Sequence, residues 1–132
     1  MLDKTLVLCR GIRGSGKSTL AETIAPDANF SADQWFEANG GYDPRRIEDA
    51  HSACRESVSR AMTNGVPVIA VHNTFTRNWE MKPYHEIAQQ FGYEVFVVVC
   101  ENDFGTIHGG GPEVNEKMKA RWEPRFFPKE SK

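Results

Sequence analysis

Short apolar runs alternate along this chain with segments in which apolar residues recur every three or four positions. A short apolar run predicts a buried strand, and a period of 3.6 residues predicts an amphipathic helix. We expect four strands, at residues 5–9, 29–31, 67–71 and 93–100. We expect helices at residues 17–24, 31–36, 44–64, 82–91 and 112–123. Strands that alternate with helices are typical of an α/β domain with a parallel sheet.

Capping residues set the expected bounds of two of these helices. Ser31 and Gln34 have the S-x-x-Q spacing of a capping box, so a short helical turn is expected to begin there. Asp43 followed by Pro44 favours the start of a long helix, with Asp as the cap and Pro at the first position. Gly65 is expected to end that helix as a left-handed residue.

A glycine-rich loop, GIRGSGKST at residues 11–19, follows the first strand and has the form G-x-x-x-x-G-K-[ST]. In such a loop the backbone N–H groups and the helix N-terminus converge on nucleotide phosphates. The lysine reaches the β- and γ-phosphates and the serine hydroxyl ligates Mg²⁺. We therefore expect ATP and Mg²⁺ as ligands, Ser18 as the metal ligand, and a phosphate site made of Arg13, Gly14, Ser15, Gly16, Lys17, Ser18 and Thr19.

The fold class that follows is a three-layer P-loop NTPase or kinase fold, with a parallel sheet of about four strands and helices on both faces. At 132 residues the chain is expected to form one P-loop domain, residues 1–124, with a tail at residues 125–132. Within the loop, the Arg13 side chain either approaches phosphate or points to water.

Composition and charge limit the expected location and partners of the protein. No run of 18 or more apolar residues and no secretion signal are present, so no membrane span is expected. The three cysteines are widely spaced, which favours reduced thiols and a cytoplasmic location. Sixteen basic and eighteen acidic residues leave a formal charge of −2, which excludes a basic field over the whole domain but not a local basic groove.

A kinase also needs a group that takes the proton of the acceptor hydroxyl, and Asp33, just past the second strand, is the candidate. The alternative is that Asp33 only stabilises the first helical turn. The third strand is followed by an expected turn at residues 72–78 and ends without a carboxylate, which disfavours GTPases and motor ATPases. We interpret His72 there as a polar strand-end residue rather than a ligand.

Four segments resemble the polynucleotide-kinase-like branch of small P-loop kinases, which includes phage and repair 5′-polynucleotide kinase domains and related ATP-binding domains. They are RGIRGSGKSTLA, FSADQWF, HNTFTRNWEMKPY, and YEVFVVV followed by IHGG and a helix ending MKARWE. Together they cover residues 6–123, and NT-x-x-x-x-WEMKPY is the most specific. The resemblance to phage domains also suggests a viral origin, with the host cytoplasm as location.

The resemblance implies roles for single residues. Lys17 and Asp33 become the catalytic pair, with Asp33 taking the proton from the acceptor, and Asn73 and Thr74 become part of the acceptor-side wall. The implied activity is transfer of the γ-phosphoryl group of ATP to a hydroxyl, expected to be the 5′-OH of a DNA or RNA end or of a nucleotide-like acceptor.

Two positions depart from the family pattern. Phe36 stands where these kinases usually carry an arginine that contacts the acceptor phosphate, and residues 103–111 lack the usual lid arginines. Phe36 argues against a standard 5′-OH acceptor more than against kinase chemistry. The missing lid arginines keep a catalytically weak ATP-binding module open, and the small size and near-neutral charge favour a small-molecule kinase as a further alternative. The aromatic residues Trp35, Phe36 and Tyr42 follow Asp33 and either stack on an acceptor base or pack in the protein.

Overall fold

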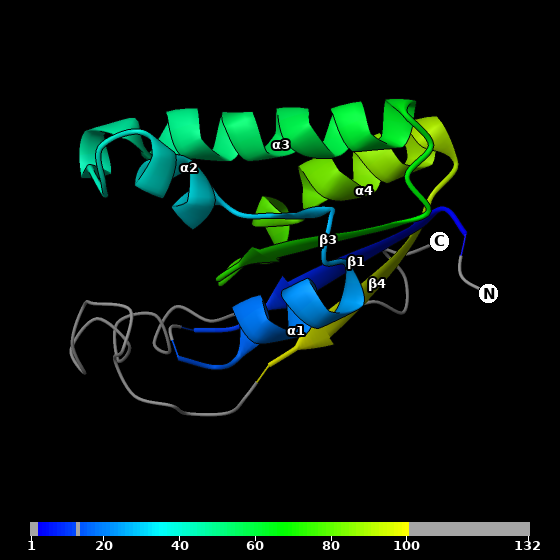
Figure 1. The fold of residues 1–132 in the computed structure, drawn as a ribbon, viewed down its shortest axis with the longest axis horizontal. Helices are drawn as coiled ribbons and strands as arrows, with labels where there is room; N and C mark the ends of the chain where they lie inside the picture. Colours follow the sequence, from blue (N-terminus) through cyan, green and yellow to red (C-terminus); the bar gives the residue numbers. More distant parts are fainter. Residues whose placement is uncertain (1–2, 13, 101–132) are drawn as a thin grey trace.

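A single parallel sheet organises the protein, and the computed structural model describes residues 3–12 and 14–100 of the chain. The sheet has four strands in the order β2-β3-β1-β4, and each neighbouring pair is parallel. The strands are β1 (Thr5–Arg10), β2 (Asn29–Phe30), β3 (Val68–Asn73) and β4 (Glu94–Val99). Because all four run the same way, their carboxyl ends, and the loops that follow β1, β2 and β3, lie at one edge of the sheet (Figure 1).

Helices cover both faces of the sheet, which confirms the expected three-layer α/β architecture. In Figure 1, α1 lies on one face, whereas α3 and α4 lie on the other and α2 sits beside the first turns of α3. The helices are α1 (Lys17–Ile24), α2 (Ala32–Ala38), α3 (Ile47–Thr63) and α4 (Lys82–Phe91), with short 3-10 turns η1 (Pro44–Arg46) and η2 (Asn78–Glu80). None of the helices in the described residues is long and apolar enough to cross a membrane.

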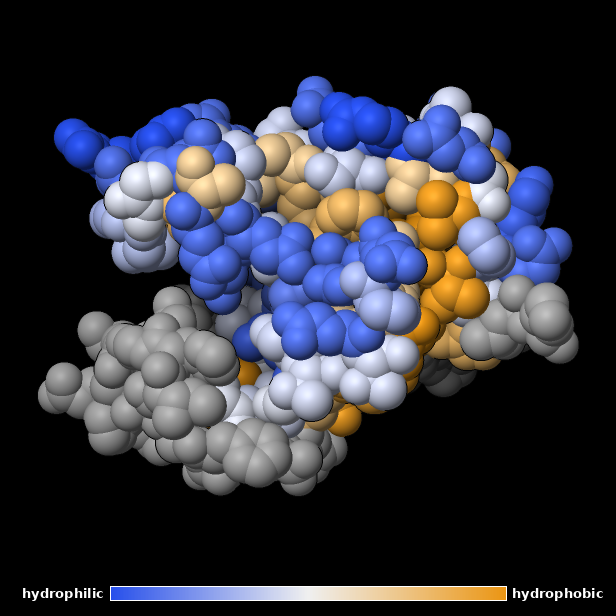
Figure 2. Space-filling view, viewed as in Figure 1, coloured by the Kyte–Doolittle hydropathy of each residue, from blue (hydrophilic) through white to orange (hydrophobic). Residues whose placement is uncertain are grey.

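Two apolar layers flank the sheet because successive side chains of a strand point to opposite faces. Leu6 and Leu8 of β1 join the large cluster under α3 and α4, whereas Val7 and Cys9 join the small cluster under α1. A third cluster of Ala32, Phe36 and Ala50 lies between α2 and α3, apart from both. The layers are visible at the surface, where apolar residues show between the polar outer sides of α1 and α3 (Figure 2).

The helix caps follow the sequence prediction in part. The Ser31 hydroxyl accepts a hydrogen bond from the Gln34 N–H at 3.1 Å and begins α2, which continues to Ala38 rather than ending after one turn. Gly65 follows α3 in the left-handed conformation (φ 74°). The helix expected from residue 44 begins instead as the 3-10 turn η1, in which Asp43 accepts from the Arg45 N–H at 2.9 Å.

The carboxyl end of β3 is where the sequence prediction was wrong. The strand was expected to stop at residue 71, but it continues to Asn73, with His72 opposite Cys9 and Asn73 opposite Arg10 of β1. Polar side chains can continue a central strand here because each finds a partner at the edge of the sheet. The predicted loop 105–111, the helix 112–123 and the tail 125–132 lie outside the described residues.

Arg10 ties the end of β1 to the chain that follows β3. Its side chain is fully buried, and Nε and Nη2 donate to the carbonyl oxygen of Phe75 at 3.0 and 2.6 Å. Phe75 itself has φ 50°, in the left-handed region, and its ring packs edge-on against Tyr84. A bulky residue rarely adopts this conformation, so the Arg10 contacts and the ring packing must hold it there.

We expect Arg10→Ala to lower the free energy of unfolding by about 3 kcal/mol, because the Phe75 carbonyl then loses a charged donor in a buried place. Urea denaturation measures the change. Arg60→Ala, an exposed arginine on α3, is the control and should change stability by less than about 0.5 kcal/mol. Equal effects of the two substitutions would contradict the structural role given to Arg10.

Candidate nucleotide and acceptor site

The phosphate-binding loop joins β1 to α1 at the carboxyl edge of the sheet. Gly14 (φ 78°) and Gly16 (φ 90°) are left-handed, and the Ser15 N–H donates to the Ile12 carbonyl at 3.2 Å. Gly16 is the cap residue of α1, and no side chain caps the first turn of that helix. The N–H groups of that turn therefore remain available to an anion.

The loop is closely packed at Gly11, and it leaves a buried hydroxyl at Ser15 that a nucleotide phosphate could satisfy. A Cβ on Gly11 would lie 2.8 Å from the backbone oxygen of Cys100 and would collide with the Ser15 side chain, so only glycine is tolerated there. The Ser15 hydroxyl is buried and meets no hydrogen-bond partner among the described residues. A buried polar atom without a partner is costly, and a phosphate oxygen would satisfy it.

Lys17 and Ser18 open α1, so the loop delivers both residues to the same place. The charge of Lys17 reaches two other strand ends: it helps to lower the pKa of His72, which burial lowers most, and it opposes the burial that raises the pKa of Cys100. The ammonium group therefore acts near the carboxyl ends of β3 and β4. Thr19 follows in the same turn and is exposed.

His72 touches Ser18, which the sequence interpretation missed. Nδ1 of His72 lies 3.3 Å from Oγ of Ser18, and the imidazole is buried. The signal was its place at the end of the strand beside β1, where P-loop proteins hold a carboxylate near the metal-binding serine. Among the described residues no three His, Cys, Asp or Glu side chains gather as a metal site, so an ion at Ser18 would take most of its ligands from phosphates and water.

Asp33 is the second residue of α2 and is exposed at the edge of the sheet where the P-loop lies. Its charge acts on both His72 and His51, so it belongs to the same electrostatic environment as Lys17. Asn73 is buried and its Oδ1 accepts from the Ala32 N–H at 2.9 Å. Asn73 thereby fixes the first turn of α2 and with it Asp33, while Thr74 follows β3 half-buried.

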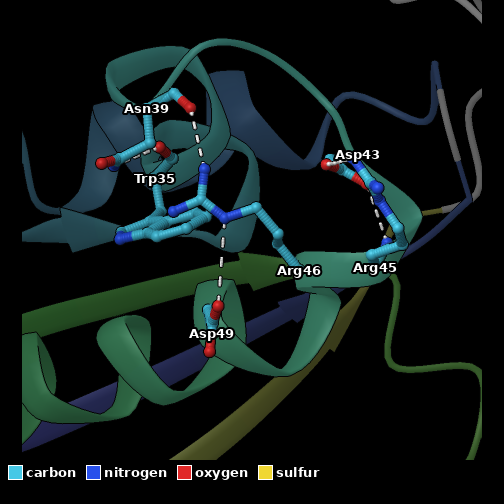
Figure 3. A network of polar contacts seen from close by, with 6 residues as sticks. All are labelled: Trp35, Asn39, Asp43, Arg45, Arg46 and Asp49. Carbon is cyan, nitrogen blue, oxygen red and sulfur yellow. Dashed lines mark hydrogen bonds and ion pairs between the residues drawn. The ribbon is translucent and has the colours of Figure 1, made fainter.

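The aromatic residues after Asp33 divide into two kinds. Phe36 is buried against α3, whereas Trp35 is half-exposed and Tyr42 is 63% exposed. The guanidinium of Arg46 stacks over the Trp35 ring, 4.5 Å from its centroid (Figure 3). Nη1 of the same arginine donates to the Asn39 carbonyl at 3.3 Å, so a cation lies against the helix that carries Asp33. The residues Arg13 and 103–111 lie outside the described residues.

The comparison that decides the family is a match of an AAA domain model, AAA_33, to residues 6–109. The chain belongs to this AAA domain family. A curated relative, human NEDD4-binding protein 2, is 38% identical to the domain over an alignment of 96 residues, and the match covers 68% of this chain and 5% of that protein. The chain therefore spans about one-twentieth of the length of that relative.

Solved structures share the fold of this AAA domain. A structure of the Pnkp1/Rnl/Hen1 complex matches with a TM-score of 0.64 and 16% identity, over 100% of this chain and 44% of that chain. The APS kinase CysC of Mycobacterium tuberculosis matches with a TM-score of 0.56 and 12% identity, over 91% of this chain and 95% of that chain. At these identities the likeness shows a P-loop kinase-like fold.

Proposed function

We propose that this AAA domain is an ATP-dependent kinase that transfers the γ-phosphoryl group to a hydroxyl, the 5′-OH of a polynucleotide or of a nucleotide-like acceptor. The observation that carries the proposal is the position of Asp33. The Asn73 side chain holds the start of α2 at the edge of the sheet where the P-loop lies, so the exposed carboxylate of Asp33 belongs to the same edge as the phosphate loop. A GTPase or motor needs no such base for an acceptor hydroxyl.

In this proposal each group has one task. The loop from Gly14 to Thr19 holds the phosphates, Lys17 neutralises charge that develops on the γ-phosphoryl group, and Ser18 contributes to the Mg²⁺ site. Asp33 accepts the proton of the acceptor hydroxyl as the new P–O bond forms. Asn73 and Thr74 form the wall next to the acceptor, and Asn73 acts through its hold on α2.

A polynucleotide acceptor is supported by the resemblance of the WEMKPY segment and by the fold shared with a protein of an RNA repair complex. Trp35 and Arg46 supply the chemistry that such an acceptor needs, a flat apolar face for a base and a cation for a phosphate. Arg46 would take over the task of the arginine that Phe36 replaces, because Phe36 is buried and cannot reach an acceptor.

We expect Arg46→Ala to weaken binding of a 5′-OH oligonucleotide and to reduce the slope of log affinity against log salt by about 1. Fluorescence anisotropy over a salt series measures both quantities. Arg60→Ala removes the same charge at the far end of α3 and is the matched control. Identical salt slopes in wild type and Arg46→Ala would exclude Arg46 from the acceptor surface.

Labelled ATP tests the activity itself. The protein is incubated with γ-labelled ATP and a divalent cation, with 5′-OH DNA, 5′-OH RNA, a nucleoside, adenosine 5′-phosphosulfate or no acceptor. Label on an oligonucleotide or on the nucleoside supports the proposal, and label only on adenosine 5′-phosphosulfate replaces it with a small-molecule kinase. ATP binding without transfer to any acceptor would leave the second candidate, a nucleotide-binding module. In the described residues, the β3 residue that contacts Ser18 is His72 and not a carboxylate, which favours that candidate.

A further inference from the structure

The residue beside the P-loop serine sets this chain apart from P-loop proteins in general. In those proteins, Mg²⁺ is held by the loop serine or threonine and by an aspartate at the end of a neighbouring strand. Here β3 lies directly beside β1, and the residue of β3 that contacts Ser18 is His72, with Nδ1 3.3 Å from Oγ. An imidazole therefore occupies the place of a carboxylate.

Asn29 and Gln34 both lie against Nε2 of His72, and the Asn29 contact is compatible with a lone pair on Nδ1. The amide Nδ2 of Asn29 donates to the carbonyl oxygens of Ala25 at 2.9 Å and Pro26 at 3.3 Å, so its Oδ1 is the atom that faces His72. This oxygen accepts from the Gln34 amide at 2.9 Å and lies 3.3 Å from Nε2 of His72. The amide Nε2 of Gln34 lies 3.2 Å from the same ring nitrogen. In the tautomer that donates the Nε2–H of His72 to Asn29 Oδ1, the lone pair of Nδ1 faces the Ser18 hydroxyl.

This arrangement is the one that metal-binding histidines usually have, in which the second ring nitrogen donates to an oxygen that orients the ring. A neutral imidazole offers its lone pair, whereas a protonated one would repel a cation.

The distance between the two donor atoms suits a shared ion. Two ligands that occupy adjacent corners of an octahedron, each about 2.1 Å from the metal, lie about 3.0 Å apart. The observed separation of 3.3 Å between Ser18 Oγ and His72 Nδ1 is close to that value. Imidazole nitrogen suits Mn²⁺, Co²⁺ and Ni²⁺ better than Mg²⁺, which takes oxygen ligands.

We propose that Ser18 Oγ and His72 Nδ1 form an oxygen–nitrogen pair that binds the divalent cation of the nucleotide and selects Mn²⁺, Co²⁺ or Ni²⁺ over Mg²⁺. The inference rests on the nucleotide site of the proposed function and not on phosphoryl transfer. The remaining ligands come from the phosphates and water, since the described residues hold no cluster of three metal-binding side chains.

Pulsed electron paramagnetic resonance of Mn²⁺ tests the nitrogen ligand directly. The whole chain, labelled with ¹⁵N-histidine, is loaded with Mn²⁺ and a non-hydrolysable ATP analogue. We expect a ¹⁵N coupling, which adenine nitrogens cannot produce, in wild type and in His85→Gln, a control on α4. The coupling should vanish in His72→Gln, which keeps a neutral polar side chain.

Ion preference is the second readout. Calorimetry of nucleotide binding with Mn²⁺ and with Mg²⁺ should show that wild type favours Mn²⁺, and that His72→Asp lowers this Mn²⁺-over-Mg²⁺ ratio by at least about tenfold. Bound Mn²⁺-nucleotide without a histidine coupling in wild type overturns the inference and leaves the proposed kinase intact. No nucleotide binding with any ion overturns both. The wild-type measurement decides the matter even if a His72 variant fails to fold.

Discussion

Asp33→Asn is expected to lower the rate of phosphoryl transfer by about 10²- to 10⁴-fold while ATP affinity stays within about twofold. An amide cannot take the proton of the acceptor hydroxyl, yet it keeps the size and hydrogen-bonding shape of the carboxylate. Nucleotide binding should persist because the phosphate loop is built from β1 and α1, whereas Asp33 belongs to α2.

Single-turnover assays with labelled ATP and equilibrium binding of the nucleotide measure the two quantities separately. Glu37→Gln is the matched control, since it removes an exposed carboxylate from the same helix. If Asp33 only stabilised the first turn of α2, its loss would cost up to about 1 kcal/mol of stability and leave transfer nearly unchanged. That pattern would remove Asp33 from the chemistry.

Lys17→Ala is expected to lower both the ATP affinity and the rate of phosphoryl transfer. It should weaken ATP binding by at least about tenfold and lower the rate of transfer by a further 10²-fold or more, about the value of one preorganised charged donor. The reason is position: Lys17 begins α1, and its charge already acts on His72 and Cys100 at the neighbouring strand ends.

Lys82→Ala, an exposed lysine at the start of α4, provides the control for a changed net charge. The contrast between the two catalytic variants is the diagnostic result, because Asp33→Asn should separate binding from transfer and Lys17→Ala should not. Unchanged transfer in Lys17→Ala would mean that the loop binds something other than the transferred phosphate.

Most of the fold could be predicted because local signals agree with the tertiary structure. Interactions between residues close in sequence determine the bounds of α1, the cap at Ser31 and the end of α3 before Gly65. The end of β3 could not be predicted this way. His72 and Asn73 are polar, and only their partners on α1 and α2 make a strand possible at those positions.

The candidate site shows the same limit. The phosphate loop is contiguous in sequence, so the motif alone names Lys17 and Ser18, which begin α1. The orientation of His72 depends on Asn29, which is 43 residues away, and the cation beside Trp35 comes from Arg46 in another element. Contacts between residues far apart in the chain produce no spacing pattern, so a single sequence cannot predict them.

The small apolar cluster between α2 and α3 has a consequence for how such a domain can change. Ala32, Phe36 and Ala50 pack with each other and with Trp35, apart from the two clusters that hold the sheet together. Substitutions in this cluster can therefore reshape the acceptor side without opening cavities under β1 or β3. In evolutionary terms, the packing lets residues around α2 diverge at small thermodynamic risk, while the clusters that flank the sheet constrain the side that carries the phosphate loop.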